Sequence, residues 1–285
     1  MKCYVAIDIG GTKIKYCRVN EAGETSEVSS ADTPHDVTGG QVISFLQSIV
    51  EKVWIEGVEG IGISTLGIVD EEGRVIGACD NFPELQNLNI KKALEDLFQK
   101  PVYVMNDVNA AALGEAYFGA GKQLDTFYCL TLGTGIGGAL VLNKKVYLGA
   151  NGMAGEAGYL WNHENERYEE KASVKAFLEQ IDEQDKGDLG LHVFDSLIKG
   201  EERYKTLFQE WIEKVSEGIK DIIYIIDPGV IIIGGGISER GRFLTDAVQE
   251  SLERQIMPDF KGKTKIIPAK HYNMANLLGA ISPFV

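Results

Sequence analysis

Two glycine-rich turns, each between strand patterns, are the feature that most constrains the fold of this chain. The first turn, Gly10-Gly11-Thr12, separates strand patterns at residues 4–9 and 13–19, and a third pattern follows at residues 24–31. The second turn, Gly133-Thr134-Gly135, separates residues 126–132 from residues 137–142, and residues 145–148 follow. A β-turn-β-turn-β unit that occurs twice predicts an internally duplicated fold with a cleft between its halves.

Helical patterns alternate with buried strand patterns in both halves, which predicts an α/β fold. Buried strands are expected at residues 60–66, 102–105, 229–233 and 265–268. Helices are expected at residues 42–53, 88–98, 107–118, 204–222, 243–256 and 273–281, the last capped by Asn273. The polar stretches 164–171 and 182–190 are expected to be loops. We expect an N-terminal domain of residues 1–118, completed by residues 273–285, and a second domain of residues 119–272.

The composition is that of a globular protein, and its charge excludes some classes of partner. Of 285 residues, 42 are acidic and 28 basic, which gives a net charge of −14. Such an acidic surface disfavours binding to nucleic acid or to anionic membranes. The most apolar stretch after the N-terminus, residues 222–233, is interrupted by Asp227-Pro228-Gly229, and the four cysteines form no C-x-x-C pair. We therefore expect a cytoplasmic protein with free thiols and no membrane span.

The first glycine turn carries the residues of a phosphate-binding loop. Gly10 and Gly11 allow backbone N–H groups to approach an anion closely, and Thr12 adds a hydroxyl donor beside Lys13. Asp8, at the end of the preceding strand, is suited to orient a hydrated Mg²⁺ beside those phosphates. A plain hairpin turn would also explain the two glycines, so both interpretations stay open here.

Two further glycine clusters repeat this chemistry. Gly133, Thr134, Gly135 and Gly137 lie in one of them, and a simple hairpin or bulge needs fewer glycines. The other, Gly234-Gly235-Gly236, precedes a helix and would let a flat ring lie against the backbone. A tight strand–helix turn explains this last cluster equally well.

Asn106-Asp107 begins the expected Ala-rich helix, directly after a buried strand. Asp107 could serve as a general base at the mouth of the cleft. It could also be an N-terminal helix carboxylate that interacts with the helix dipole. The residues alone do not separate these two interpretations.

The order of these motifs closely resembles the ROK family (repressors, open reading frames, kinases) along almost the whole chain. The matching motifs are Asp8-x-Gly-Gly-Thr-Lys, Asn106-Asp107-x-Asn-Ala-Ala, Leu132-Gly-Thr-Gly-Ile-Gly-Gly, Gly155-Glu156-x-Gly158 and Gly234-Gly-Gly-Ile-Ser. The resemblance implies a duplicated, ribonuclease-H-like (actin-like) two-domain fold with ATP and sugar in the interdomain cleft. It further implies that Asp107 is the general base and that Gly67 lies in a loop on the sugar side. By the same resemblance, Asn81, Asn106, Glu156 and Glu169 would hold the sugar.

The chain departs from the family pattern where members commonly carry a His and then a cysteine-rich zinc segment. Tyr159 stands at the His position, and residues 162–169 contain no cysteine, only His163 nearby. We therefore expect no zinc site of the usual four-ligand kind. Because the family's His lies near the anomeric end of the sugar, Tyr159 in its place leaves the sugar's identity open and favours glucose or a β-glucoside.

These observations predict an ATP- and Mg²⁺-dependent kinase that phosphorylates a hexose, expected at its 6-hydroxyl. The alternatives are a non-catalytic sugar sensor or transcriptional regulator of the same family, and a kinase for another hexose such as fructose or N-acetylmannosamine. A regulator is disfavoured because only seven residues precede Asp8, because the chain is acidic, and because Asp107 is present. We expect a small-molecule sugar as the partner and a homodimer as the assembly.

Overall fold

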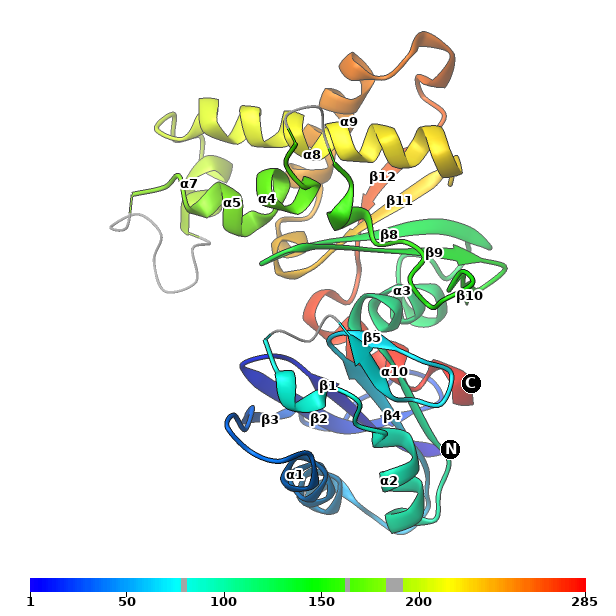
Figure 1. Ribbon diagram of the computed structural model, residues 1–285. Helices are drawn as coiled ribbons and strands as arrows, with labels where there is room; N and C mark the ends of the chain where they lie inside the picture. Colours follow the sequence, from blue (N-terminus) through cyan, green and yellow to red (C-terminus); the bar gives the residue numbers. More distant parts are fainter. Residues whose placement is uncertain (78–80, 162–164, 183–191) are drawn as a thin grey trace. The chain divides into compact units, whose positions relative to one another are not determined.

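A computed structural model describes residues 1–77, 81–161, 165–182 and 192–285, and these form two compact units (Figure 1). The first unit holds residues 1–122, 144–154 and 274–285, and the second holds residues 123–143 and 155–273. The stretch 144–154, which the sequence prediction assigned to the second domain, thus groups with the first unit. No helix among the described residues is both long and apolar enough to cross a bilayer.

The first unit is built around a five-stranded sheet with the order β3-β2-β1-β4-β7. β1 pairs antiparallel with β2 and parallel with β4, and β4 pairs parallel with β7. The elements of this unit are β1 (Cys3–Ile9), β2 (Lys13–Asn20), β3 (Ser29–Asp32), α1 (Gly39–Val53), β4 (Val58–Thr65), β5 (Ile68–Val69), β6 (Val75–Gly77), α2 (Ile90–Phe98), β7 (Val102–Asn106), α3 (Asp107–Phe118), β10 (Lys145–Val146) and α10 (Ala275–Ala280).

Alternation along β1 explains why helices cover both faces of this sheet. Val5 and Ile7 pack in one buried cluster with side chains of α1 and α2, whereas Tyr4 and Ala6 pack with side chains of α10. On the latter face α10 packs against α3, where an added Cβ at Gly279 would overlap the Ala110 carbonyl. Only glycine permits this close helix contact, which holds the C-terminal helix beside the start of α3.

The second unit contains the sheet strands β9, β8, β11 and β12, in that order, and a set of helices that cover one face. β8 runs antiparallel to β9 and parallel to β11. The elements of this unit are β8 (Thr126–Leu132), β9 (Ile136–Leu142), α4 (Tyr168–Ala172), α5 (Val174–Leu178), α7 (His192–Ile198), α8 (Lys205–Ile226), β11 (Val230–Gly234), α9 (Arg242–Gln255) and β12 (Lys265–Pro268).

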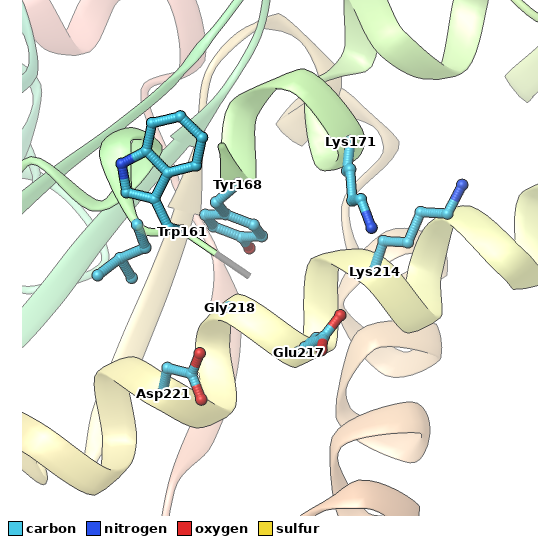
Figure 2. Close-up of a pocket in the computed structure, with 8 residues that line it drawn as sticks. Trp161, Tyr168, Lys171, Lys214, Glu217, Gly218 and Asp221 are labelled. Atoms are coloured by element: carbon cyan, nitrogen blue, oxygen red, sulfur yellow. The ribbon is translucent and has the colours of Figure 1, made fainter. Parts of the chain in front are cut away.

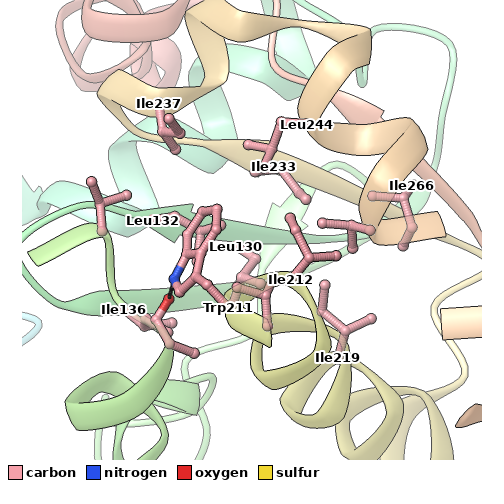
Figure 3. Packing of buried hydrophobic residues seen from close by; sticks show 14 of the residues in the cluster. Leu130, Leu132, Ile136, Trp211, Ile212, Ile219, Ile233, Ile237, Leu244 and Ile266 are labelled. Carbon is pink, nitrogen blue, oxygen red and sulfur yellow. Dashed lines mark hydrogen bonds between the residues drawn. The ribbon is translucent and has the colours of Figure 1, made fainter. Parts of the chain in front are cut away.

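The core of the second unit lies between its sheet and α8. Figure 3 shows Trp211 and Ile212 of α8 packed with Leu130 of β8 and Ile233 of β11. The Trp211 indole N–H also donates to the carbonyls of Ala172 and Ser173, at 3.0 and 3.2 Å. This bond ties the short helices α4 and α5 to the long helix α8.

The predicted helices and strands are largely present, with three corrections. The third strand, predicted at residues 24–31, covers only Ser29–Asp32, the residues whose backbone pairs with residues 13–16 of β2. Residues 164–171 were expected to be a loop, yet α4 begins at Tyr168, where the Glu170 carboxylate accepts from the Arg167 N–H at 2.8 Å. Asn273 does not cap the last helix: Met274 occupies that position, and the Asn273 amide donates to Glu239 instead.

Three further differences concern short elements. The third strand of the second repeat, predicted at residues 145–148, is reduced to Lys145–Val146. The β5–β6 hairpin was not predicted, and the turn between its strands is held by Asp70, whose carboxylate accepts from the Glu72 and Arg74 N–H groups. Most of the loop predicted at residues 182–190 lies outside the described residues.

Candidate active site

Three predicted motifs meet at one edge of the first sheet. The last residues of β1, β4 and β7 are in register, Ile9 opposite Thr65 and Thr65 opposite Asn106. In open α/β sheets, ligands bind beyond the carboxyl ends of parallel strands. The first glycine turn, the loop at Gly67 and the start of α3 all follow directly from these strand ends, so the fold brings them together.

Asn106 is the N-cap of α3 and fixes the carboxylate of Asp107. Its Oδ1 accepts from the N–H groups of Val108 and Asn109 at 2.9 and 3.2 Å. Its Nδ2 donates to the Gly67 carbonyl and to Oδ1 of Asp107, each at 3.0 Å. An amide has two donor hydrogens and two acceptor positions, so all four are engaged. Asn106, which was expected to hold the sugar, therefore acts in this structure as the residue that orients Asp107.

Asp107 combines the two roles that the sequence left open. It is the first residue of α3, and its Oδ1 also accepts from the Val108 N–H at 2.9 Å, as a helix N-terminal carboxylate does. These bonds hold Oδ1 of Asp107 in place, and a general base must be positioned within hydrogen-bond reach of its substrate. The structure thus gives Asp107 a fixed orientation at the strand edge, beside the first glycine turn.

Asp8 lies near the end of β1, half-buried between two side-chain donors. The Ser64 hydroxyl and the Asn276 amide both donate to its Oδ1, at 2.8 and 3.1 Å. Burial raises the pKa of Asp8, while these two bonds and the charge of Lys15 lower it. Neither Ser64 nor Asn276 was predicted as a partner of Asp8, because β4 and α10 approach Asp8 only in the folded chain.

The first glycine turn is a compact structure with no room for side chains. The Gly10 N–H donates to the Lys13 carbonyl at 3.1 Å, and an added Cβ at Gly11 would lie 2.9 Å from the Cβ of Asn81. Asn81, expected in the sugar site, is thus adjacent to the expected phosphate loop. The Thr12 carbonyl accepts from Thr33, and the Lys13 ammonium forms an exposed ion pair with Asp32 at 2.8 Å.

The second and third glycine clusters meet in the second unit. β8 and β11 are parallel neighbours, with Thr131 opposite Gly234. Gly235 has a φ of 84°, and an added Cβ there would overlap the carbonyl of Leu132, directly before Gly133. No atom of the described residues lies within 4 Å of the positions where Gly133 and Gly236 would carry a Cβ, and Thr134 is exposed. Gly137 lies opposite Thr131 in the ladder and accepts from its hydroxyl at 3.4 Å.

Two glutamates predicted to bind the sugar lie in this second unit, near the glycine clusters. Oε2 of Glu169 lies close to two glycines. It would be 2.7 Å from a Cβ added to Gly135 and 3.3 Å from a Cβ added to Gly158. Desolvation raises the pKa of Glu156, and the charge of the nearby Glu169 raises it further. Glu156 is exposed and Glu169 half-buried, so both carboxylates can accept hydrogen bonds from the hydroxyl groups of a ligand.

Aromatic and cationic side chains brace the segment that carries Tyr159 and Glu169. The Arg167 guanidinium lies over the rings of Tyr159 and Trp161, 5.4 and 5.8 Å from their centroids. Tyr168 is buried, and its hydroxyl donates to the Val215 carbonyl of α8 at 2.7 Å. Tyr159 itself is 48% exposed. The hydrogen bond of Tyr168 therefore holds this segment to α8, while Tyr159 remains exposed.

A pocket of about 230 Å³ lies between this segment and α8 (Figure 2). Figure 2 shows Lys171, Lys214 and Glu217 at one end and Asp221 nearer to Trp161. Lys171 is paired with Glu166 at 2.9 Å. Two lysines and two carboxylates line this pocket, so their charges balance. Tyr168 and Lys171 of α4, the helix that carries Glu169, line it, but no predicted site residue is among the described residues of its lining.

The protein side chains fit Mg²⁺ held mainly by a nucleotide. Mg²⁺ in phosphoryl-transfer sites is usually bound by one or two carboxylates, waters and substrate phosphates. Asp8 supplies one carboxylate, fixed through Oδ1, next to the first glycine turn. In the described ranges no three His, Cys, Asp or Glu side chains gather as a metal cluster, and His163 falls outside those ranges.

Comparison with known proteins gives a consistent result. The ROK family model matches residues 4–284. A β-glucoside kinase of Listeria innocua is 30% identical, with 98% of this chain and 96% of that protein covered. A ROK glucokinase of Streptomyces griseus, solved with glucose and AMPPNP, has a TM-score of 0.82 at 27% identity and covers 98% of this chain and 97% of its own.

A ROK protein of Streptococcus pneumoniae, solved with sucrose, has a TM-score of 0.85 at 26% identity, covering 99% of this chain and 97% of its own. These structures share the actin-like fold of sugar kinases, as the sequence analysis predicted. The family match spans nearly all of the 285 residues. This chain therefore belongs to the ROK family.

Proposed function

We propose that this protein is an ATP-dependent sugar kinase that transfers the γ-phosphoryl group to a hydroxyl, expected to be the 6-hydroxyl, of a hexose such as glucose or of a β-glucoside. The observation that carries the proposal is the fixed Asp107 carboxylate at the strand edge beside the first glycine turn. Relatives named glucokinase and β-glucoside kinase, and one relative solved with glucose and AMPPNP, support it.

Phosphoryl transfer requires positioning, neutralisation of charge and a base for the attacking hydroxyl. Asp107 would accept the proton of the sugar hydroxyl, while Asn106 and the Val108 N–H keep its carboxylate in one orientation. The turns at Gly10–Gly11, Gly133–Gly135 and Gly234–Gly236 would donate backbone N–H groups to the nucleotide. Mg²⁺, oriented by Asp8, would neutralise phosphate charge when bound.

Glu156 and Glu169 would accept hydrogen bonds from ring hydroxyls, together with Asn81. Because Tyr159 is exposed and replaces the His typical of the family, we propose that a substituent on the anomeric oxygen is tolerated. Comparing kcat/KM for glucose, methyl β-glucoside and cellobiose tests this point. If both β-glucosides fall a thousandfold below glucose, a difference of about 4 kcal/mol, the anomeric side is closed.

A coupled assay for ADP release, run across free hexoses, N-acetylated amino sugars and β-glucosides, tests the proposed activity directly. The proposal predicts turnover with at least one of these sugars, dependent on Mg²⁺. Sugar binding by calorimetry without any ADP release would instead favour the sugar-sensing alternative. A cytoplasmic homodimer stays a prediction from the sequence, and light scattering after size-exclusion chromatography tests the oligomeric state.

A further inference from the structure

A second cavity, of about 390 Å³, lies in the first unit beside the start of α3. Its walls come from three segments: residues 69–71 at the end of β5, residues 104–106 of β7 with Asn109 of α3, and residues 148–152. The volume falls within the roughly 300–1,000 Å³ of small-molecule sites. It would hold roughly a dozen water molecules at about 30 Å³ each, so a sugar ring fits.

The 148–152 wall is a defined turn that closes on itself. The Ala154 N–H donates to the Leu148 carbonyl at 3.1 Å, and Gly149 and Gly152 adopt φ angles of 70° and 74°. At Gly152 an added Cβ would lie 3.6 Å from the Val69 carbonyl oxygen, so the turn packs against the end of β5. The cavity therefore lies between ordered elements of one unit.

The polar groups of this cavity suit a neutral, hydroxyl-rich ligand. The side-chain amides of Asn109 and Asn151 line it, and neither makes a hydrogen bond within the described part of the chain. Asp70 and Glu71 add carboxylates, which repel anions, and Asp70 is already paired with Arg74 at 3.2 Å. Amides that donate and accept at once, beside carboxylates, match the hydroxyl groups of a saccharide better than a phosphate or an apolar group.

Asn106 connects this cavity to the proposed base. It lines the cavity and donates to Oδ1 of Asp107 at 3.0 Å, but Asp107 itself is not among the lining residues. A sugar ring that receives the phosphoryl group must reach Asp107 by a hydrogen bond. The cavity and the proposed base therefore share Asn106 as a neighbour, and a ligand longer than one sugar ring could reach both.

We infer that this cavity is an acceptor subsite for the second sugar residue of a disaccharide, whose first residue is phosphorylated at Asp107. The inference rests on the proposed function. It adds to that function a specificity site formed by Asn109 and by the 148–152 turn that carries Asn151.

The test compares a filled cavity with a matched control. Ala150 is exposed on the rim, so Ala150→Trp places an indole across the cavity without disturbing the core, and Ala22→Trp makes the same change in an exposed turn elsewhere in this unit. Cellobiose, gentiobiose, maltose and sucrose are the probes. We expect the ratio of kcat/KM for the best disaccharide to that for glucose to fall at least tenfold in Ala150→Trp and to stay within twofold in Ala22→Trp.

Calorimetry of the same disaccharide without nucleotide provides a readout that does not depend on turnover. Asn151→Ala should weaken its binding at least threefold while glucose binding changes less than twofold. The inference is wrong if no disaccharide binds, or if Ala150→Trp changes disaccharide and glucose kinetics equally. If no sugar is phosphorylated but a disaccharide binds and Ala150→Trp abolishes that binding, the proposed kinase activity fails and the subsite stands.

Discussion

Substitutions at Asn106 can separate the stability of α3 from the orientation of Asp107. Asn106→Ala removes two cap bonds, to the N–H groups of Val108 and Asn109, and two donated bonds, to Gly67 and Asp107. Loss of an N-cap costs about 1–2 kcal/mol, and the further bonds about 1 kcal/mol, so we expect about 2–3 kcal/mol of lost stability. Because a displacement of about 1 Å can reduce a rate about 100-fold, kcat should fall by about 10- to 100-fold.

Asn106→Ser is the informative variant. Serine caps helices about as well as asparagine but cannot donate to both Gly67 and Asp107, so stability should fall by only about 1 kcal/mol while kcat falls as in the alanine variant. Asn89→Ala is the matched control: it removes the N-cap of α2, which accepts from Lys92 at 2.9 Å, and should cost about 1 kcal/mol with kcat unchanged. Thermal unfolding and steady-state kinetics give both quantities. Wild-type kcat in Asn106→Ser would refute the orienting role of the amide.

Three other predictions concern packing, pH and metal. Gly218→Ala should destabilise the protein by about 2–3 kcal/mol, because its Cβ would overlap the buried Tyr168 ring and break the bond from Tyr168 to Val215. Gly40→Ala, at the start of α1, should be neutral or stabilising in the same melts, because its Cβ would lie at an ordinary contact distance of 3.9 Å from the Thr38 hydroxyl oxygen. The pKa of Glu156 lies above its ordinary value of 4.5, so the folded protein binds a proton on this carboxyl more tightly than the unfolded chain does. The free energy of unfolding therefore decreases as the pH rises from 4.5 through the higher pKa of the folded state. Glu156→Gln should therefore raise the Tm more at pH 8 than at pH 4, and an equal shift at both values would contradict this. Elemental analysis should find no stoichiometric zinc, and a chelator should stop turnover without lowering the Tm; one zinc per chain, lost together with stability, would contradict the interpretation of residues 159–169.

The sequence predicted the strands and the glycine turns of both units because these are local signals. Alternating apolar residues ended by Gly-Gly or Gly-Thr-Gly specify a strand and its turn without reference to the rest of the chain. The helix that begins at Asp107 was predicted for the same reason, since Asn106 is a strong N-cap after an apolar strand.

Contacts between distant segments could not be predicted in this way. Asn276 lies 268 residues from Asp8, and nothing in its neighbourhood indicates that its amide donates to that carboxylate. The helix at Tyr168 is stabilised by its contacts with Val215 and Gly218 of α8, although its own sequence is polar and charged. In both cases tertiary packing overrides the local pattern.

The most direct test of the central claim is the Asp107→Asn variant, measured for turnover and for sugar binding on the same preparation. The amide keeps the size of the carboxylate but cannot accept the proton of a hydroxyl. We predict that kcat falls by about 10²–10⁴-fold, the range of a lost general base, while the Kd for the best sugar of the ADP-release screen changes by less than about threefold. Full kcat in this variant would contradict the assignment of Asp107 as the base and, with it, the proposed mechanism.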